Sequence, residues 1–127
     1  MTQIVEWIHG SKAVTRNKRS QELHIDWDDG PTPVEMLIQS AGACSLADVV
    51  IGLKDRVFSK AWVEIEAERH DGTPRYVTSL HFHFFVQGEV PIKLVERLVE
   101  KAFERYCSVT HSLRKDMNLT WESTVTN

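Results

Sequence analysis

Two cysteine residues, Cys44 and Cys107, are the side chains of this sequence best suited to covalent chemistry. They are 63 residues apart, and neither belongs to a C-x-x-C motif. Each lies in a predicted helix. If the fold brings the two helices together, one thiol can react with a peroxide and the other can resolve the product as a disulfide. The pair therefore points to thiol peroxidase chemistry, with two buried and purely structural thiols as the alternative.

The length of 127 residues fits one domain, residues 1–127, with enough chain for a hydrophobic core. A formal net charge of −3 disfavours nucleic acid as a partner. The first residues lack the basic, apolar and small-residue regions of a signal peptide, so we expect a cytoplasmic protein. The longest charge-free stretch, residues 36–47, is too short to cross a bilayer and ends at Asp48, so we expect no membrane association.

Alternating apolar and polar residues predict several strands. A first strand is expected at residues 3–9 and a second around residues 23–27, where Leu23, Ile25 and Trp27 alternate with polar residues. The polar and basic segment between them predicts a hairpin connection or a short irregular strand. Two further alternations, on either side of a Gly- and Pro-containing turn, predict an antiparallel hairpin. A last strand is expected near residues 119–125.

Prolines open two predicted helices. The first runs from Pro33 to about residue 54, and its middle consists of very small side chains, which indicates close packing of another backbone or room for a ligand. It has almost no polar face, so we expect a central helix covered on most sides. The second follows Pro91 and ends at Cys107, with a short helical turn at residues 108–115. Helices do not alternate one for one with strands, so the order predicts an α+β fold with mainly antiparallel pairing.

Three segments of the chain resemble the OsmC/Ohr family of peroxide-resistance proteins, in particular its short, less characterised members. They are residues 33–50, with a Pro-x-Glu-x-Leu start and an Ala-Gly-Ala-Cys-Ser core, residues 104–110, Glu-Arg-Tyr-Cys-Ser-Val-Thr, and residues 118–121, Asn-Leu-Thr-Trp. The resemblance implies an intertwined homodimer in which antiparallel sheets wrap round two long central helices, with active sites at the subunit interface. It also implies a stress-response peroxidase that favours organic hydroperoxides.

By motif, the resemblance implies that Cys44 is the peroxidatic residue and Cys107 the resolving one. Family enzymes also use a Glu near the start of the first helix, for which the candidate here is Glu35. It stands one residue after the position of the strongest enzymes, which Val34 occupies in this chain.

The family's third catalytic group is an Arg from the N-terminal hairpin, for which Arg16 and Arg19 are the candidates, with Arg75 as a further one. A guanidinium stabilises the thiolate that attacks the O–O bond and can hold the leaving alkoxide through paired donors.

Histidines offer two weaker constellations. His81 and His83 share one face of a strand, but spacing identifies no third ligand, so we expect neither a metal nor a cofactor. His111, four residues after Cys107, has the spacing of a base to a thiol, yet no oxyanion motif accompanies it and hydrolysis is not expected.

Three functions therefore stay open. The first is a hydroperoxide reductase that needs an external thiol reductant. The second is a redox-responsive or small-molecule-binding dimer with little or no turnover, and the third is a structural use of both thiols. The Arg and Glu pair discriminates among them, because only the first function needs it.

Overall fold

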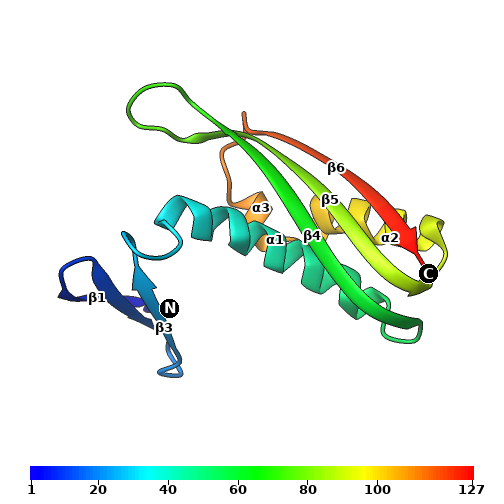
Figure 1. The fold of residues 1–127 in the computed structure, drawn as a ribbon, viewed down its shortest axis with the longest axis horizontal. Coiled ribbons are helices and arrows are strands. Elements are labelled where there is room, and N and C mark those ends of the chain that lie inside the picture. The colour runs from blue at the N-terminus through cyan, green and yellow to red at the C-terminus, as the bar shows by residue number, and fades with distance from the viewer. The chain divides into compact units, whose positions relative to one another are not determined.

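The computed structural model describes residues 1–127 and has two three-stranded sheets and three α-helices (Figure 1). Its contacts divide the chain into two compact units, Met1–Leu37 and Ile38–Asn127. The predicted α+β class is confirmed.

The first unit contains an antiparallel sheet of β1 (Ile4–His9), β2 (Lys12–Arg16) and β3 (Glu22–Asp26). The central strand β2 occupies the segment for which the sequence left a connection or an irregular strand open. Its five residues pair continuously with β3, so it is a regular strand. One face of this sheet is apolar and open to solvent, because Val5, Trp7 and Leu23 are 69%, 65% and 56% exposed.

The second unit contains a sheet in the order β4 (Val57–Arg69), β5 (Val77–Glu89) and β6 (Asn118–Thr126). The hairpin of β4 and β5 is antiparallel, as predicted, and each strand is longer than its alternating segment. Strand β6 pairs with β5 in parallel, whereas the other three strand pairs are antiparallel, in keeping with the mainly antiparallel pairing predicted. The helical segment between β5 and β6 carries the chain back to the end where β5 began, as a parallel crossover requires.

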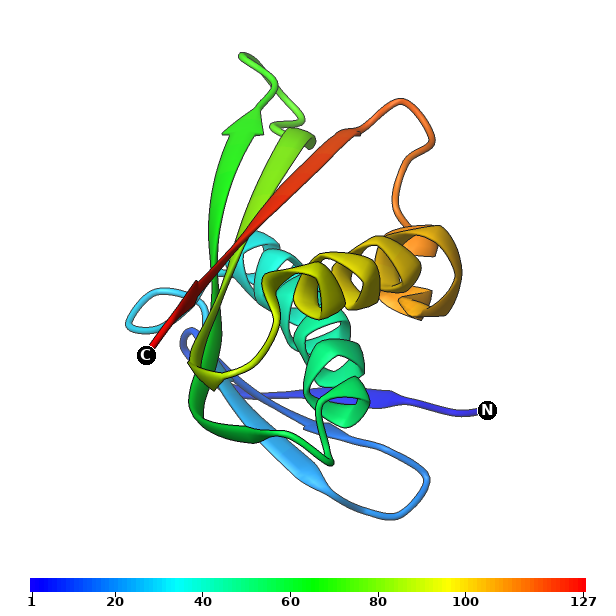
Figure 2. The ribbon, with the colours of Figure 1, turned by 90° about the vertical axis from the view of Figure 1, so that its right-hand side faces the viewer.

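Helices cover one face of this second sheet (Figures 1 and 2). They are α1 (Pro33–Gly52), which enters the unit at Ile38, α2 (Ile92–Lys101), the π-helical turn η1 (Ala102–Tyr106) and α3 (Ser108–His111). Phe103 of η1 anchors them, since its ring lies 4.7 Å from the ring of Phe82 and 4.5 Å from that of Trp121. The predicted second long helix is therefore a ten-residue α-helix extended by a π turn.

One chain by itself covers only part of α1, although the sequence predicts a helix covered on most sides. Its buried residues are Ala41, Gly42, Ser45 and Val49. An 18-residue window of the helix has a mean hydropathy of 1.5 and only 22% of it is buried, so by length and composition alone the helix is apolar enough to span a membrane.

Candidate functional site

Cys44 lies in the regular middle of α1 and is half-buried. The small residues around it are explained by close packing on β4, because a Cβ atom added at Gly42 would lie 2.7 Å from Cδ1 of Ile65. Ser45 is fully buried and donates its hydroxyl within the helix, to the carbonyls of Ala41 at 2.8 Å and Gly42 at 3.2 Å. The serine next to the thiol is thus satisfied without the cysteine.

Cys107 lies in a break between two helical segments and is fully buried. Its backbone N–H closes the π turn by donating to the carbonyl of Ala102 at 2.8 Å. Its sulfur then caps α3, accepting from the backbone N–H of Thr110 at 3.5 Å, while the Thr110 hydroxyl donates to the Cys107 carbonyl at 3.1 Å. The residue is therefore held by bonds on both sides of a non-helical position, where a single π turn often marks a functional site.

The two thiols are neighbours, and both are free. Burial raises the pKa of Cys107, the bonds with Thr110 act against that rise, and the adjacent Cys44 thiol raises the pKa further. Cys107 is therefore held as a protonated, shielded thiol, while Cys44 is the one that solvent and a small oxidant can reach. The arrangement brings together the two residues that the sequence singled out.

Glu35 is engaged at the start of α1. Its side chain accepts from the backbone N–H of Thr32 at 2.8 Å, and the Thr32 hydroxyl accepts from the backbone N–H of Glu35 at 3.2 Å. These two bonds form a reciprocal capping box at the start of α1. Pro33, the residue after Thr32, occupies the first position of the helix, where proline is favoured. The signal Thr-x-x-Glu stands in the sequence, and it offers a structural reason for a glutamate at this position.

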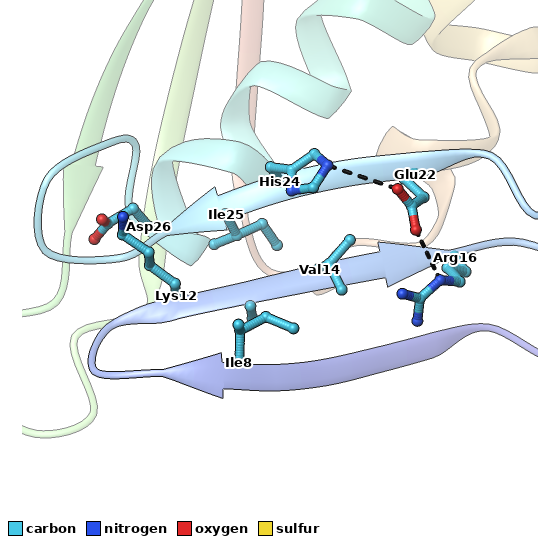
Figure 3. Close-up of a pocket in the computed structure, with 9 residues that line it drawn as sticks. Ile8, Lys12, Val14, Arg16, Glu22, His24, Ile25 and Asp26 are labelled. Carbon is cyan, nitrogen blue, oxygen red and sulfur yellow. Dashed lines mark hydrogen bonds and ion pairs between the residues drawn. The ribbon is translucent and has the colours of Figure 1, made fainter.

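Arg16 lies on β2 between two carboxylates, with 2.8 Å separating its Nη1 from Glu6 Oε1 and its Nε from Glu22 Oε2. The hydrogen bonds to Glu6 and Glu22 raise the pKa of Arg16, so it stays cationic. The guanidinium lines a pocket of about 520 Å³ on this sheet, whose apolar part includes Ile8 and Val14 (Figure 3). Arg19 is exposed in the following turn, where its backbone N–H donates to the side chain of Asn17.

The histidine pair of β5 bonds to the neighbouring strand β6. His81 lies 2.6 Å from both Thr120 Oγ1 and Glu122 Oε2, and His83 lies 2.7 Å from Thr124 Oγ1. The hydrogen bond from His81 lowers the pKa of Glu122 below its usual value, and the nearby His83 lowers it further. Partial desolvation of the carboxylate acts in the opposite direction but does not outweigh them. No group of three or more His, Cys, Asp and Glu side chains in residues 1–127 is arranged to hold a metal ion.

The two remaining sequence candidates lie on the surface. Arg75 is exposed in the β4–β5 turn, and its carbonyl accepts from Nε of Arg69 at 2.8 Å. His111 is exposed at the end of α3, where its backbone N–H donates to the carbonyl of Cys107 at 3.1 Å.

Asp48, which ends the charge-free stretch of residues 36–47 in the sequence, also lies at this site. Asp48 is one helical turn beyond Cys44, and its Oδ2 is buried without a hydrogen-bond partner. The signal available in the sequence was its spacing, since Asp48 is the only charged residue of α1 after Glu35.

Comparisons with known proteins agree with the resemblance read from the sequence. Residues 26–122 match the family described as OsmC-like protein. Over 124 residues the chain is 33% identical to Protein YhfA of Escherichia coli K12, with 91% of each chain covered.

Two solved structures have the same fold. One is an OsmC-like protein from Mycoplasma pneumoniae, with a TM-score of 0.79 and 14% identity, covering 99% of this chain and 96% of that one. The other is an organic hydroperoxide resistance protein from Elizabethkingia anophelis, with a TM-score of 0.63 and 17% identity, covering 98% of this chain and 94% of that one. At these identities the likeness concerns the fold alone.

Proposed function

Because the chain belongs to the OsmC-like protein family, we propose that it reduces organic hydroperoxides with Cys44 as the attacking thiol and Cys107 as the resolving thiol. The observation that carries the proposal is the pairing of a half-buried thiol on α1 with a fully buried thiol beside it. A resolving thiol has to be adjacent to the sulfenic acid yet shielded from the oxidant. Family membership itself indicates a redox or peroxide-stress role.

The proposed reaction has three steps. The Cys44 thiolate attacks the hydroperoxide, so an S–O bond forms, the O–O bond breaks, and the alkoxide leaves and takes up a proton to become the alcohol. Sulfur is oxidised by two electrons to a sulfenic acid. The Cys107 thiol then attacks that sulfur, water is released and a disulfide forms, which an external dithiol reductant returns to two thiols. No cofactor is needed.

Formation of the disulfide requires Cα atoms no more than about 7 Å apart. Cys107 lies at a non-helical position between η1 and α3, so local opening after Tyr106 supplies any adjustment that the bond needs.

Activation of the attacking thiol falls to the sequence candidates Arg16, Arg19 and Glu35. Arg16 has the better-supported position of the two arginines, because two carboxylates fix its guanidinium at the wall of a partly apolar pocket. Single substitutions of Arg16 and Arg19 identify the functional arginine, since only its loss slows the first step.

A homodimer is the proposed assembly. The apolar face of the first sheet and the exposed residues Leu37 and Ile51 of α1 are surfaces that a small monomer does not leave in water. We propose a second copy and not a lipid bilayer as the cover of α1, because one face of the helix is already packed on β4 and α2 and Asp48 interrupts its apolar run. Sedimentation showing a stable folded monomer at micromolar concentration contradicts this assembly. A cytoplasmic location is part of the same proposal.

A second candidate function is a redox-responsive or small-molecule-binding dimer with little turnover. It is favoured by the partners of the activating residues: Glu35 is bound in the capping box and Arg16 is neutralised by Glu6 and Glu22. Such partners lower the capacity of both residues to activate a thiolate.

Titration with cumene hydroperoxide, with free thiols counted after each addition, separates the two functions. A peroxidase loses both thiols for each equivalent of hydroperoxide and forms one equivalent of alcohol. Repeating the titration with an excess of a dithiol reductant then shows turnover. A wild-type protein that reacts no faster than a free cysteine at the same pH contradicts the peroxidase and leaves the binding function.

A further inference from the structure

Asp48 carries the only buried side-chain oxygen or nitrogen of residues 1–127 that has no hydrogen-bond partner. The side chain as a whole is half-buried, but its Oδ2 is cut off from solvent, and none of the ion pairs of the chain includes it. Leaving a buried polar atom unpaired is unfavourable, and more so for a charged group. A carboxylate at this point of an otherwise apolar helix therefore calls for a chemical reason.

The position of Asp48 is set by contacts on both neighbouring turns of α1. Cys44, four residues before it, lies beside the thiol of Cys107. Gly52, four residues after it, packs on α2, because a Cβ there would lie 2.4 Å from Cδ2 of Leu98. Residues four apart on a helix share a face, with Cβ atoms about 5–6 Å apart. Asp48 thus faces the run of α2 and η1, one turn from the thiol pair.

Nothing on the facing run neutralises this carboxylate. The charged residues of α2 and η1 are all exposed: Lys93, Glu96, Arg97, Glu100, Lys101, Glu104 and Arg105. The other carboxylate of α1, Glu35, is occupied by the capping box. Asp48 is consequently the acidic group of α1 that is free to exchange a proton near Cys44.

Building on the proposed hydroperoxide reduction, we infer that Asp48 is the proton-transfer residue of the thiol site. Its carboxylate accepts the proton that the Cys44 thiol loses. The sulfur lone pair forms the S–O bond, the O–O electron pair departs on the alkoxide, and the carboxylic acid of Asp48 returns the proton to that alkoxide. The proton moves from thiol to alcohol without a further co-reactant, and Asp48 ends in its starting form.

The inference predicts a dependence on the leaving group that a structural role does not produce. Asp48→Asn keeps the size of the side chain and removes its capacity to carry a proton, and Asp55→Asn, at an exposed position after α1, is the matched control. The first turnover is followed with tert-butyl hydroperoxide, whose alkoxide needs a proton to leave, and with peracetic acid, whose acetate does not. Asp48→Asn should slow the first reaction about 100-fold and leave the second nearly unchanged. Asp55→Asn should change neither.

Alkylation of Cys44 by iodoacetamide at pH 7 supplies a readout apart from peroxide chemistry. Solvent can accept the proton of the Cys44 thiol in place of Asp48, and iodide leaves without a proton, so Asp48→Asn should not slow alkylation. Because the substitution removes a neighbouring negative charge, the variant should be alkylated at the wild-type rate or faster. Equal slowing of alkylation and of both oxidants shows a misplaced thiol and overturns the inference.

The remaining outcomes separate this inference from the proposed function. Wild-type protein that reduces tert-butyl hydroperoxide no faster than a free thiol refutes the function, and the role of Asp48 with it. If wild type is active and Asp48→Asn reacts with both oxidants at the rates of Asp55→Asn, the role of Asp48 is refuted but the function is not. The role of Asp48 is also refuted if Asp48→Asn weakens the dimer while the ratio of its rates with tert-butyl hydroperoxide and peracetic acid stays that of wild type. If Asp48→Asn does not fold by circular dichroism, Asp48→Ser replaces it with the same selective loss expected, and a folded serine variant that keeps the tert-butyl hydroperoxide rate overturns the inference.

Discussion

The two cysteines occupy contrasting backbone settings. Cys44 lies in the middle of a regular 20-residue helix, among side chains kept small by the packing of Gly42 on β4, and it is half-buried. Cys107 lies at a non-helical residue between a π turn and a four-residue helix, fully buried and tied to Thr110. A reactive group benefits from a rigid support, whereas a group that must move to its partner benefits from an irregular one. The contrast matches the two roles proposed for the thiols.

The largest effect is expected from removing each thiol in turn. Cys44→Ser should abolish hydroperoxide consumption, because the serine hydroxyl is not a nucleophile for the O–O bond. Cys107→Ser should still consume one equivalent and stop at a sulfenic acid, which dimedone traps on Cys44 for detection by mass spectrometry. Equal behaviour of the two variants contradicts the division of roles.

A methyl group at Gly52 should disturb the contact between α1 and α2. The added Cβ would lie 2.4, 2.8 and 3.1 Å from three atoms of Leu98, so we expect Gly52→Ala to lower the free energy of unfolding by about 1–3 kcal/mol. Gly42→Ala is the comparison, because there a single contact, 2.7 Å to Cδ1 of Ile65, is shorter than 3.0 Å and the next is an ordinary 3.4 Å to Val63.

At Gly42 the gain in helix propensity, about 1 kcal/mol, should offset most of that cost. Urea denaturation of both variants measures the difference. If the Gly52→Ala variant is as stable as Gly42→Ala, close packing of Gly52 against Leu98 at the end of α1 is contradicted.

A smaller effect is expected at the hydroxyl that holds Cys107. Thr110→Val removes the hydrogen bond to the Cys107 carbonyl and should cost about 1 kcal/mol of stability. In a Cys44→Ser background it should also speed the reaction of Cys107 with a disulfide reagent, because the break between η1 and α3 opens more often. Ser112→Ala, which removes an exposed hydroxyl bond of 2.7 Å to Ser108, is the control and should leave the rate of that reaction unchanged.

The smallest effect concerns pH. Burial raises the pKa of Cys107 in the folded protein above the unfolded value of about 8.5. The folded state therefore holds this proton more tightly, so the contribution to stability is complete below about pH 8.5 and is lost as the pH rises through that value toward the folded pKa. Unfolding free energies measured from about pH 7 to pH 10 should fall more steeply for wild type than for Cys107→Ala, and parallel curves contradict the shift.

Much of the element order was predictable from periodicity, and the departures have local causes. The β4–β5 hairpin and α1 were predicted because their apolar patterns are long and regular. For the segment of β2 the sequence predicts either a connection or an irregular strand, because Lys12 and Arg16 interrupt its apolar pattern. In the structure, pairing with β1 and β3 on its two sides stabilises it as a strand. The parallel pairing of β6 with β5 joins residues about 40 positions apart in the sequence. A local pattern of apolar and polar residues predicts a strand but not the strand with which it pairs.

The sequence alone determined the α+β class, the family, the placement of Cys44 on a helix and that of Cys107 at the end of a helical run, because each depends on residue type and spacing along one stretch of chain. Only the tertiary structure decided that the thiols of Cys44 and Cys107 adjoin, that a π turn precedes Cys107, and that the Oδ2 of Asp48 is buried without a donor. These features depend on which helix faces lie against each other, and that choice is made by contacts between distant segments, such as Gly52 on Leu98 and Phe103 on Phe82. The physical reason is that periodicity tells which face of a helix is apolar but not which surface buries it.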